Sequence, residues 1–222
     1  MHKKILIVII AFSICLLIIP DARAYELYPG YPKAWSSRTS YNQAALVHYD
    51  GNLESVYSSV SIATAYNRWA VSCSGNVYVT NTVTQNSQYP NGRIYYIVPT
   101  TNYWEGIVGT ANIYWWLGVT LLYDTNGASI TLQTASTTTS FIKSANILIQ
   151  PTYYGTFSSL TTNEKNCVVT HEIGHALGFG HPKDSQGNPL ITGYSIMDDG
   201  AISYTSIQTL DKNNLIAKYP RP

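Results

Sequence analysis

The sequence predicts an α+β domain, and three observations carry that prediction. Short runs of alternating apolar and polar residues, typical of half-buried strands, recur between residues 45 and 150. One stripe of helical spacing interrupts them early, at about residues 54–70. Two further helical segments follow the last strand, so helices and strands do not alternate regularly as they do in a doubly wound sheet.

The first expected elements are a strand at residues 45–49 and the helix at about residues 54–70. The turn dipeptide Asp50-Gly51 separates the two. The helix is predicted by side chains that recur every three or four residues, namely Val56, Val60, Ala63, Tyr66 and Trp69.

Further strands are expected where β-branched and aromatic residues alternate with polar ones. These strands cover residues 76–83, 93–99, 119–123, 130–134 and 145–150. Residues 103–116 are rich in Trp and Tyr, and their pattern does not decide between helix and strand.

The second helix has a strong start signal. Thr161-Thr162-Asn163-Glu164 fits a capping box, in which Thr161 and Glu164 each accept a hydrogen bond from the other's backbone N–H. The helix is expected to run to Leu177, because Gly178 can adopt the left-handed conformation that ends many helices. A third helix is expected from Ser206 or Thr209 to Lys218.

Residues 1–24 have the layout of a signal peptide. A basic start precedes an apolar run, and Ala22-Arg23-Ala24 provides a small-x-small cleavage site. A retained membrane anchor is the alternative, but an apolar run limited to residues 5–19 is short for a bilayer. We therefore expect a secreted, extracellular protein with a short N-terminal segment at residues 25–40 and one domain at residues 41–222.

The composition excludes some partners. The chain of 222 residues has a formal net charge of +1 at pH 7, and only 11% of its residues are charged. Without a basic run, nucleic acid and anionic membrane surfaces are not expected as partners. Once the signal peptide is removed, we expect a monomer with no stable membrane association.

The segment from His171 to His181 reads H-E-x-x-H-x-x-G-x-x-H. On a helix, His171 and His175 project from one face and can bind the same metal ion. Gly178 lets the chain turn back, so that His181 can reach that ion from outside the helix. Glu172 points away from this pair and can reach a water molecule on the metal. Three imidazole ligands and one open position are typical of catalytic zinc.

With its bend glycine and third histidine, this pattern resembles that of the metzincin zinc endopeptidases, and of the matrixin-like branch among them. Tyr194-Ser195-Ile196-Met197 resembles the Met-turn of that family, a tight 1,4-turn whose Met197 would lie beneath the zinc ligands. The order of the expected elements extends the resemblance over nearly the whole chain after residue 24. It implies a twisted, mainly parallel or mixed sheet with an active-site helix, the Met-turn and a C-terminal helix.

The resemblance also implies a function, that of a secreted zinc metalloendopeptidase that hydrolyses peptide bonds of extracellular proteins. Zn²⁺ would be bound by His171, His175 and His181, with Glu172 as general base and then general acid for a zinc-activated water. The protein or peptide substrate is expected to lie extended along a sheet edge, for which residues 130–134 are the candidate.

Three residues depart from the family pattern. His48 is the one histidine of residues 25–222 outside the motif, so a second, structural zinc is not expected, and His48 is predicted to be a sheet or turn residue. Asp199 stands where astacins and serralysins carry a tyrosine ligand. Pro182 is unlike typical matrixins, which leaves the subfamily open.

Other residues leave alternatives open. Cys73 and Cys167 would form a disulfide in an oxidising compartment, and the alternative is that Cys73 blocks the zinc of a latent precursor. Asp184, Asp198 and Asp199 flank the motif, either as solvated charges or as ligands to calcium.

Two other classes of function compete with the peptidase. One is a zinc-containing binding or toxin-like module without turnover, against which the intact Glu172 counts. The other is a surface protein in which zinc only ties the fold together. Three histidines with an open position count against it, because closed structural sites use four protein ligands.

Overall fold

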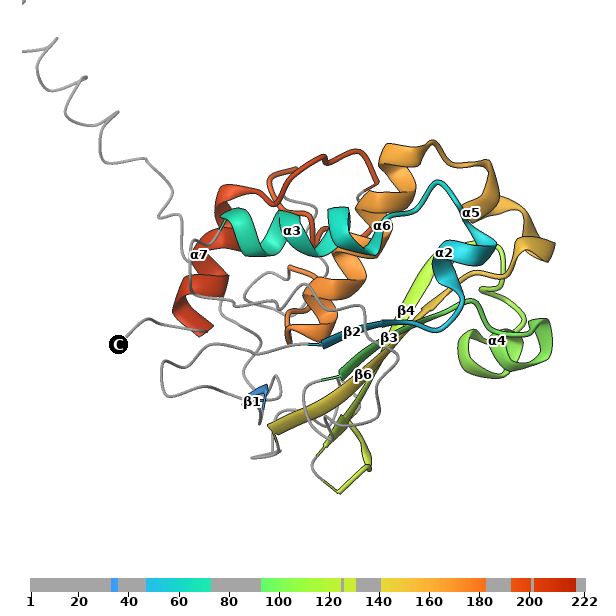
Figure 1. The fold of residues 1–222 in the computed structure, drawn as a ribbon, viewed down its shortest axis with the longest axis horizontal. Helices are drawn as coiled ribbons and strands as arrows, with labels where there is room; N and C mark the ends of the chain where they lie inside the picture. The colour runs from blue at the N-terminus through green and yellow to red at the C-terminus, as the bar shows by residue number, and fades with distance from the viewer. Residues whose placement is uncertain are drawn as a thin grey trace, which may run out of the picture.

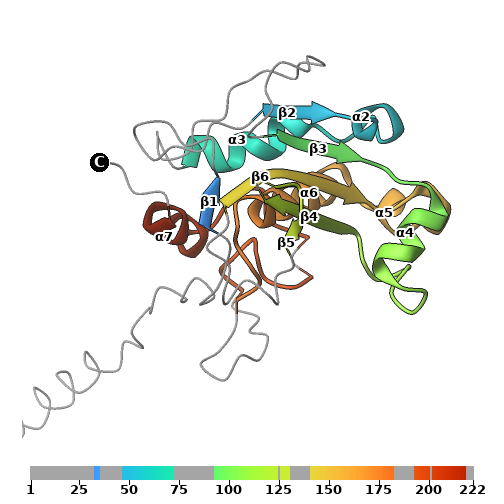
Figure 2. The same cartoon turned by 90° about the horizontal axis from the view of Figure 1, so that it is seen from below.

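The computed structural model describes residues 33–35, 47–72, 93–124, 126–130, 141–182, 193–200 and 202–218. In this part of the chain, helices α3 and α6 lie on one face of a twisted mixed β-sheet (Figures 1 and 2). The expected α+β class is confirmed. The expected signal peptide and the expected strand at residues 76–83 lie outside the described residues.

The sheet combines parallel and antiparallel pairs. Its strands follow the order β2 (Val47–Asp50), β3 (Arg93–Ile97), β6 (Phe141–Ile149), β4 (Gly118–Asp124) and β5 (Ser129–Ile130). Strands β2, β3 and β6 are mutually parallel, whereas β4 runs antiparallel to β6 and β5 runs antiparallel to β4. A mixed sheet is therefore confirmed, and its one reversed long strand, β4, lies next to the central strand β6 (Figure 2).

A short strand precedes the first one that the sequence predicts. Strand β1 (Lys33–Trp35) pairs in parallel with the start of β6, within the segment expected to come before the sheet. Three residues are too few to give a recognisable alternation, which explains why the pattern did not reveal it.

The helix predicted at residues 54–70 is in fact two helices, α2 (Leu53–Val56) and α3 (Ile62–Ser72). Where α3 begins, side-chain oxygens accept hydrogen bonds from backbone N–H groups that have no partner within the helix. The Glu54 carboxylate accepts a hydrogen bond from Ile62 N at 2.7 Å, and Ser61 Oγ accepts one from Thr64 N at 3.1 Å. This second start signal divides the stripe, because an N-terminal cap fixes the residue before the helix in a non-helical conformation.

The Trp- and Tyr-rich region forms a helix followed by turns. Helix α4 (Thr101–Val108) begins after Thr100, whose hydroxyl accepts a hydrogen bond from Tyr103 N, and buries Trp104 completely. The remaining helical pieces are η1 (Thr152–Tyr154), α5 (Thr156–Ser159), α6 (Thr162–Ala176) and α7 (Thr209–Lys218). None of the helices in the described ranges has both the length and the apolar character that a bilayer crossing requires.

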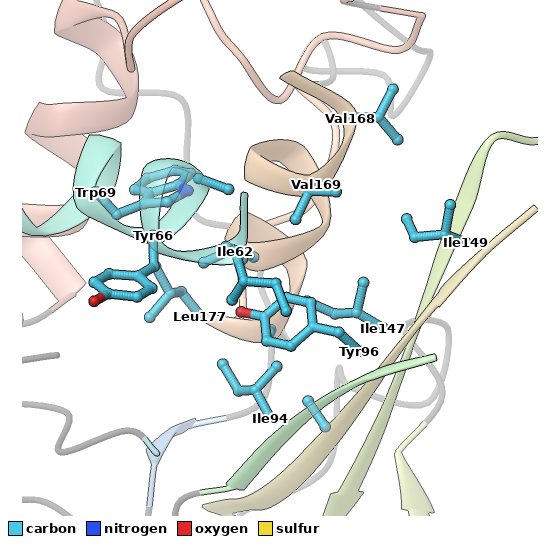
Figure 3. Packing of buried hydrophobic residues seen from close by; sticks show 14 of the residues in the cluster. Ile62, Tyr66, Trp69, Ile94, Tyr96, Ile147, Ile149, Val168, Val169 and Leu177 are labelled. Atoms are coloured by element: carbon cyan, nitrogen blue, oxygen red, sulfur yellow. The ribbon is translucent and has the colours of Figure 1, made fainter. Parts of the chain in front are cut away.

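The main core lies between the two long helices and the sheet (Figure 3). Apolar side chains come from α3, α6, β3 and β6, represented by Ile62, Trp69, Val169, Leu177, Ile94, Tyr96, Ile147 and Ile149. Trp69 also donates a hydrogen bond from Nε1 to Thr170 O at 2.8 Å, which fixes α3 against α6. This hydrogen bond joins the two helices that cover the same face of the sheet.

His48 is a buried residue of β2, in agreement with the sheet or turn position that the sequence predicts. It stacks on Tyr66 at 4.7 Å between ring centroids, and its Nδ1 lies 2.5 Å from the Tyr96 hydroxyl. Burial lowers the pKa of His48 to about 3. The ring is therefore neutral in the folded protein across the ordinary pH range.

We predict that His48 makes folding stability depend on pH. In the unfolded chain a histidine takes up its proton near pH 6.5, whereas folded His48 does so only near pH 3, so stability falls as the pH drops through this window. Acidification from pH 6.5 to 5 should cost about 1.6 kcal/mol through this residue. Urea unfolding at both pH values should show a shallower loss for His48→Phe, although this variant is less stable at pH 7 because the Tyr96 hydroxyl loses its partner. Equal losses in both proteins would contradict the prediction.

Candidate metal centre

Helix α6 carries the histidine motif and is fixed at its start by the expected capping box. Thr161 Oγ1 accepts a hydrogen bond from Glu164 N at 3.4 Å, and the Glu164 carboxylate accepts one from Thr161 N at 2.8 Å. From Asn166 to Ala176 every residue of the helix is buried. This helix contacts α3 on one side and strands β4 and β6 of the sheet on the other (Figure 1).

The C-terminal end of α6 turns the chain so that His181 lies near the two helix histidines. Gly178 adopts φ 83°, a left-handed conformation that favours glycine, and Phe179 N donates to Gly174 O while Gly178 N donates to His175 O. This pair of hydrogen bonds is the Schellman arrangement that ends many helices. The chain then folds back, and His181 reaches the imidazoles of the helix.

The three imidazoles converge on one point. His171 Nε2 lies 3.0 Å from His175 Nε2 and 3.1 Å from His181 Nε2. Their three ligand atoms all lie within 4.8 Å of one another. A tetrahedral ion with bonds of 2.0–2.1 Å would place its nitrogen ligands about 3.3 Å apart, close to the separations found here.

Backbone carbonyls orient two of the rings. His171 Nδ1 lies 2.7 Å from Ile196 O, and His175 Nδ1 lies 2.8 Å from Phe179 O. A carbonyl oxygen only accepts, so each Nδ1 carries the proton and each Nε2 presents a lone pair. The Nε2 atoms of His171 and His175 lie 3.0 Å apart, and their lone pairs repel each other unless a cation lies between them. The donor set therefore fits a single metal ion.

The electrostatics of the cluster favour neutral, metal-binding imidazoles. Burial, followed by the neighbouring His181, lowers the pKa of His171 to about 4. Burial and the two other imidazoles lower the pKa of His175 well below its usual value. Metal ligation requires unprotonated nitrogens, and both residues supply them at neutral pH.

Glu172 lies on the side of α6 that faces β4. Its carboxyl is buried, and this burial raises its pKa to about 7 although a hydrogen bond from Thr120 opposes the rise. Thr120 Oγ1 lies 2.7 Å from Glu172 Oε2. A carboxyl group with a pKa near neutrality can both accept and return a proton, which is what general acid–base chemistry needs.

A tight turn packs beneath the histidines. Asp198 N donates to Ser195 O at 3.2 Å, which closes a 1,4-turn over Ser195–Asp198, and Met197 inside it is only 4% exposed. The space that a side chain at Gly174 would fill is occupied by Met197 Sδ and the Trp69 ring. The turn thus reaches the underside of the motif helix and supplies the Ile196 carbonyl to His171.

Asp211, in the first turn of α7, holds this turn in place, and the sequence analysis did not single it out. Its carboxylate accepts hydrogen bonds from Ser195 Oγ, from Ile196 N at 2.9 Å and from Gln208 N at 2.8 Å. Ser195 Oγ in turn accepts one from Met197 N at 2.9 Å. An acidic residue at a helix start usually interacts with its own helix, so no sequence signal distinguishes this longer reach.

The other residues singled out in the sequence have separate positions. Asp198 is buried and accepts a hydrogen bond from Gly193 N at 2.7 Å, whereas Asp199 is exposed. Cys167 is buried in α6, but Cys73 and Asp184 lie outside the described residues. The disulfide and the calcium site therefore stay predictions.

No family model matches the chain, and no curated protein matches it. The function is accordingly inferred from the geometry around His171, Glu172, His175 and His181.

Gly174→Ala should loosen the metal centre. The added Cβ would overlap Met197 Sδ and lie 2.8 Å from Trp69 Cζ2, so the turn or the helix must shift. We expect a loss of about 1–3 kcal/mol in the free energy of unfolding together with weaker metal binding. Denaturant unfolding and metal titration test this, with Gly106→Ala as control because nothing lies within 4 Å of a Cβ there. An unchanged metal affinity for Gly174→Ala would contradict the close packing.

Asp211→Ala should lower metal affinity although Asp211 is not one of the predicted metal ligands. It removes the acceptor of Ile196 N and Ser195 Oγ, both buried, at an expected cost of about 2–3 kcal/mol in stability. Because Ile196 O orients His171, metal affinity should fall as well. Thermal unfolding with and without added metal measures both effects, and a variant that binds metal as tightly as the parent chain would refute the link.

Proposed function

We propose that the chain is a secreted zinc-dependent endopeptidase of the metzincin type, most similar to the matrixin-like branch. One observation carries the proposal: three imidazole nitrogens converge at the end of α6, and the same helix carries the buried carboxyl group of Glu172 next to the first of them in the chain. The tight turn with buried Met197 beneath that helix supports the resemblance to the Met-turn. The reversed strand β4 beside the motif helix supports it further.

Zinc is the metal that this donor set suits. His171, His175 and His181 would hold it, and three neutral imidazoles leave a fourth position of a tetrahedral ion for water or substrate. A zinc ion bound there would lower the pKa of a water molecule and polarise the carbonyl of the scissile bond. A closed structural site would require a fourth protein ligand, and the described residues place none in the cluster.

Glu172 would move the protons. As a base its carboxylate takes a proton from the attacking water, and as an acid it delivers that proton to the amine that leaves. The burial that raises the pKa of Glu172 to about 7 suits both halves of this task near neutral pH. This carboxyl group favours a peptidase over a binding module, because a metal site without turnover has no need of it.

The substrate would lie along β4; of the edge expected at residues 130–134, only Ile130 is among the described residues. Gly118 and Thr120 of β4 lie beside Glu172, whereas β5 pairs with β4 only at Leu122 and Tyr123. Within the described residues, the first half of β4 is hydrogen-bonded to β6 alone. An extended peptide chain could therefore pair with its other edge and present a peptide bond to the histidine cluster.

Glu172→Ala should keep one zinc per chain and lose peptide hydrolysis. The histidine ligands remain, but the proton-transfer group is gone, and such losses slow a reaction by about 10²–10⁴-fold. Metal content by elemental analysis and cleavage of a quenched-peptide library measure the two properties. Glu105→Gln, a change in α4, serves as the control that should retain activity.

The same assay distinguishes the alternatives. Full activity in Glu172→Ala would remove this residue from the mechanism. A parent chain that binds one zinc and cleaves nothing across a broad library would instead favour a binding module.

A further inference from the structure

Strand β4 presents two special positions to the motif helix. Gly118 and Thr120 are two residues apart, so they lie on the same face of the strand. Both meet Glu172: a Cβ at Gly118 would lie 2.7 Å from Glu172 Oε1, and Thr120 Oγ1 lies 2.7 Å from Glu172 Oε2. One position makes room for the carboxyl group, and the other binds it.

The Thr120 hydroxyl is within reach of two oxygens of the same residue. Besides Oε2, it lies 3.0 Å from the backbone oxygen of Glu172. The carboxyl group is buried, and Thr120 is the one described side chain that donates a hydrogen bond to it. Its orientation therefore depends on a strand that lies outside the histidine motif.

We propose that Thr120 is a positioning residue for the proton-transferring carboxyl group, an inference that rests on the proposed function. Thr120 holds Glu172 Oε2, which leaves Oε1 to take the proton of the attacking water and to return it to the leaving amine nitrogen. Thr120 keeps its own proton throughout, because Oε2 can accept its hydrogen bond whether or not Oε1 is protonated. The absence of a side chain at Gly118 leaves the space in which Oε1 lies.

A positioning role of the Thr120 hydroxyl can be distinguished from a role in packing alone. Threonine, serine and valine have similar sizes, but only threonine and serine carry the hydroxyl. If the hydrogen bond to Oε2 matters, then loss of the hydroxyl lowers turnover, while the binding of substrate and zinc is retained. If only packing matters, valine replaces threonine without loss, because the two side chains have nearly the same shape.

The test compares Thr120→Val with Thr120→Ser in the purified, zinc-loaded chain. We expect Thr120→Val to lower kcat by about 10-fold to 100-fold with KM within about twofold of the parent value, and Thr120→Ser to restore most of kcat. Zinc content should be the same in all three proteins, because no ligand is changed.

A second readout does not need turnover. Acetohydroxamate binds zinc through its two oxygens and gives up a proton to a neighbouring base, so its affinity reports where the Glu172 carboxylate lies. Calorimetry on the zinc-loaded proteins should show a Kd about tenfold weaker for Thr120→Val and close to the parent value for Thr120→Ser.

Equal kcat and equal acetohydroxamate affinity in Thr120→Val and the parent chain would overturn the proposal. So would a Thr120→Ser protein as impaired as Thr120→Val, because serine keeps the hydroxyl and the hydrogen bond to Oε2 would then not explain turnover. If Thr120→Val does not fold, Thr120→Ala takes its place against Thr120→Ser with the same readouts. A parent chain without peptidase activity would refute the proposed function, whereas the acetohydroxamate affinities would still decide the role of Thr120.

Discussion

The site depends on two hydrogen bonds between imidazoles and backbone carbonyls, from His171 to Ile196 O and from His175 to Phe179 O. They place the proton of each ring on Nδ1 and turn each Nε2 toward the shared point. A different local structure fixes the position of each carbonyl group. The Gly178 helix end positions Phe179, and the turn fixed by Asp211 positions Ile196. Side chains outside the motif thereby determine whether the histidines of the motif can bind one ion.

Burial determines the protonation of the ionisable groups at this site. Inside the protein the pKa of each helix histidine is lowered and the pKa of Glu172 is raised, because the surroundings disfavour every charged form. The same environment that keeps the imidazoles available as ligands keeps the carboxyl group near the point where it can exchange protons. A bound cation would stabilise both the lone pairs and the carboxylate. Metal binding and folding are therefore expected to support each other.

The sequence predicts the features that depend on interactions between residues close together in the chain. The capping box at Thr161, the helix end at Gly178 and the convergence of His181 with the helix histidines each follow from a few neighbouring residues, and each is confirmed. The division of the first helix was missed, because the cap at Ser61 is a weak signal inside a continuous apolar stripe. Asp211 and Thr120 were missed for a different reason. Each acts on a residue 15 or more positions away, and no spacing rule connects them.

X-ray absorption at the zinc edge of the purified chain shows whether three histidines hold one zinc ion, because it gives the number and distances of the bound atoms, separates sulfur from nitrogen or oxygen and recognises imidazole by its outer-shell scattering. We predict one zinc per chain with three nitrogen neighbours at about 2.0–2.1 Å and a single further oxygen from water. A sulfur neighbour, a fourth protein nitrogen or a protein that takes up no zinc would contradict an open site built from His171, His175 and His181.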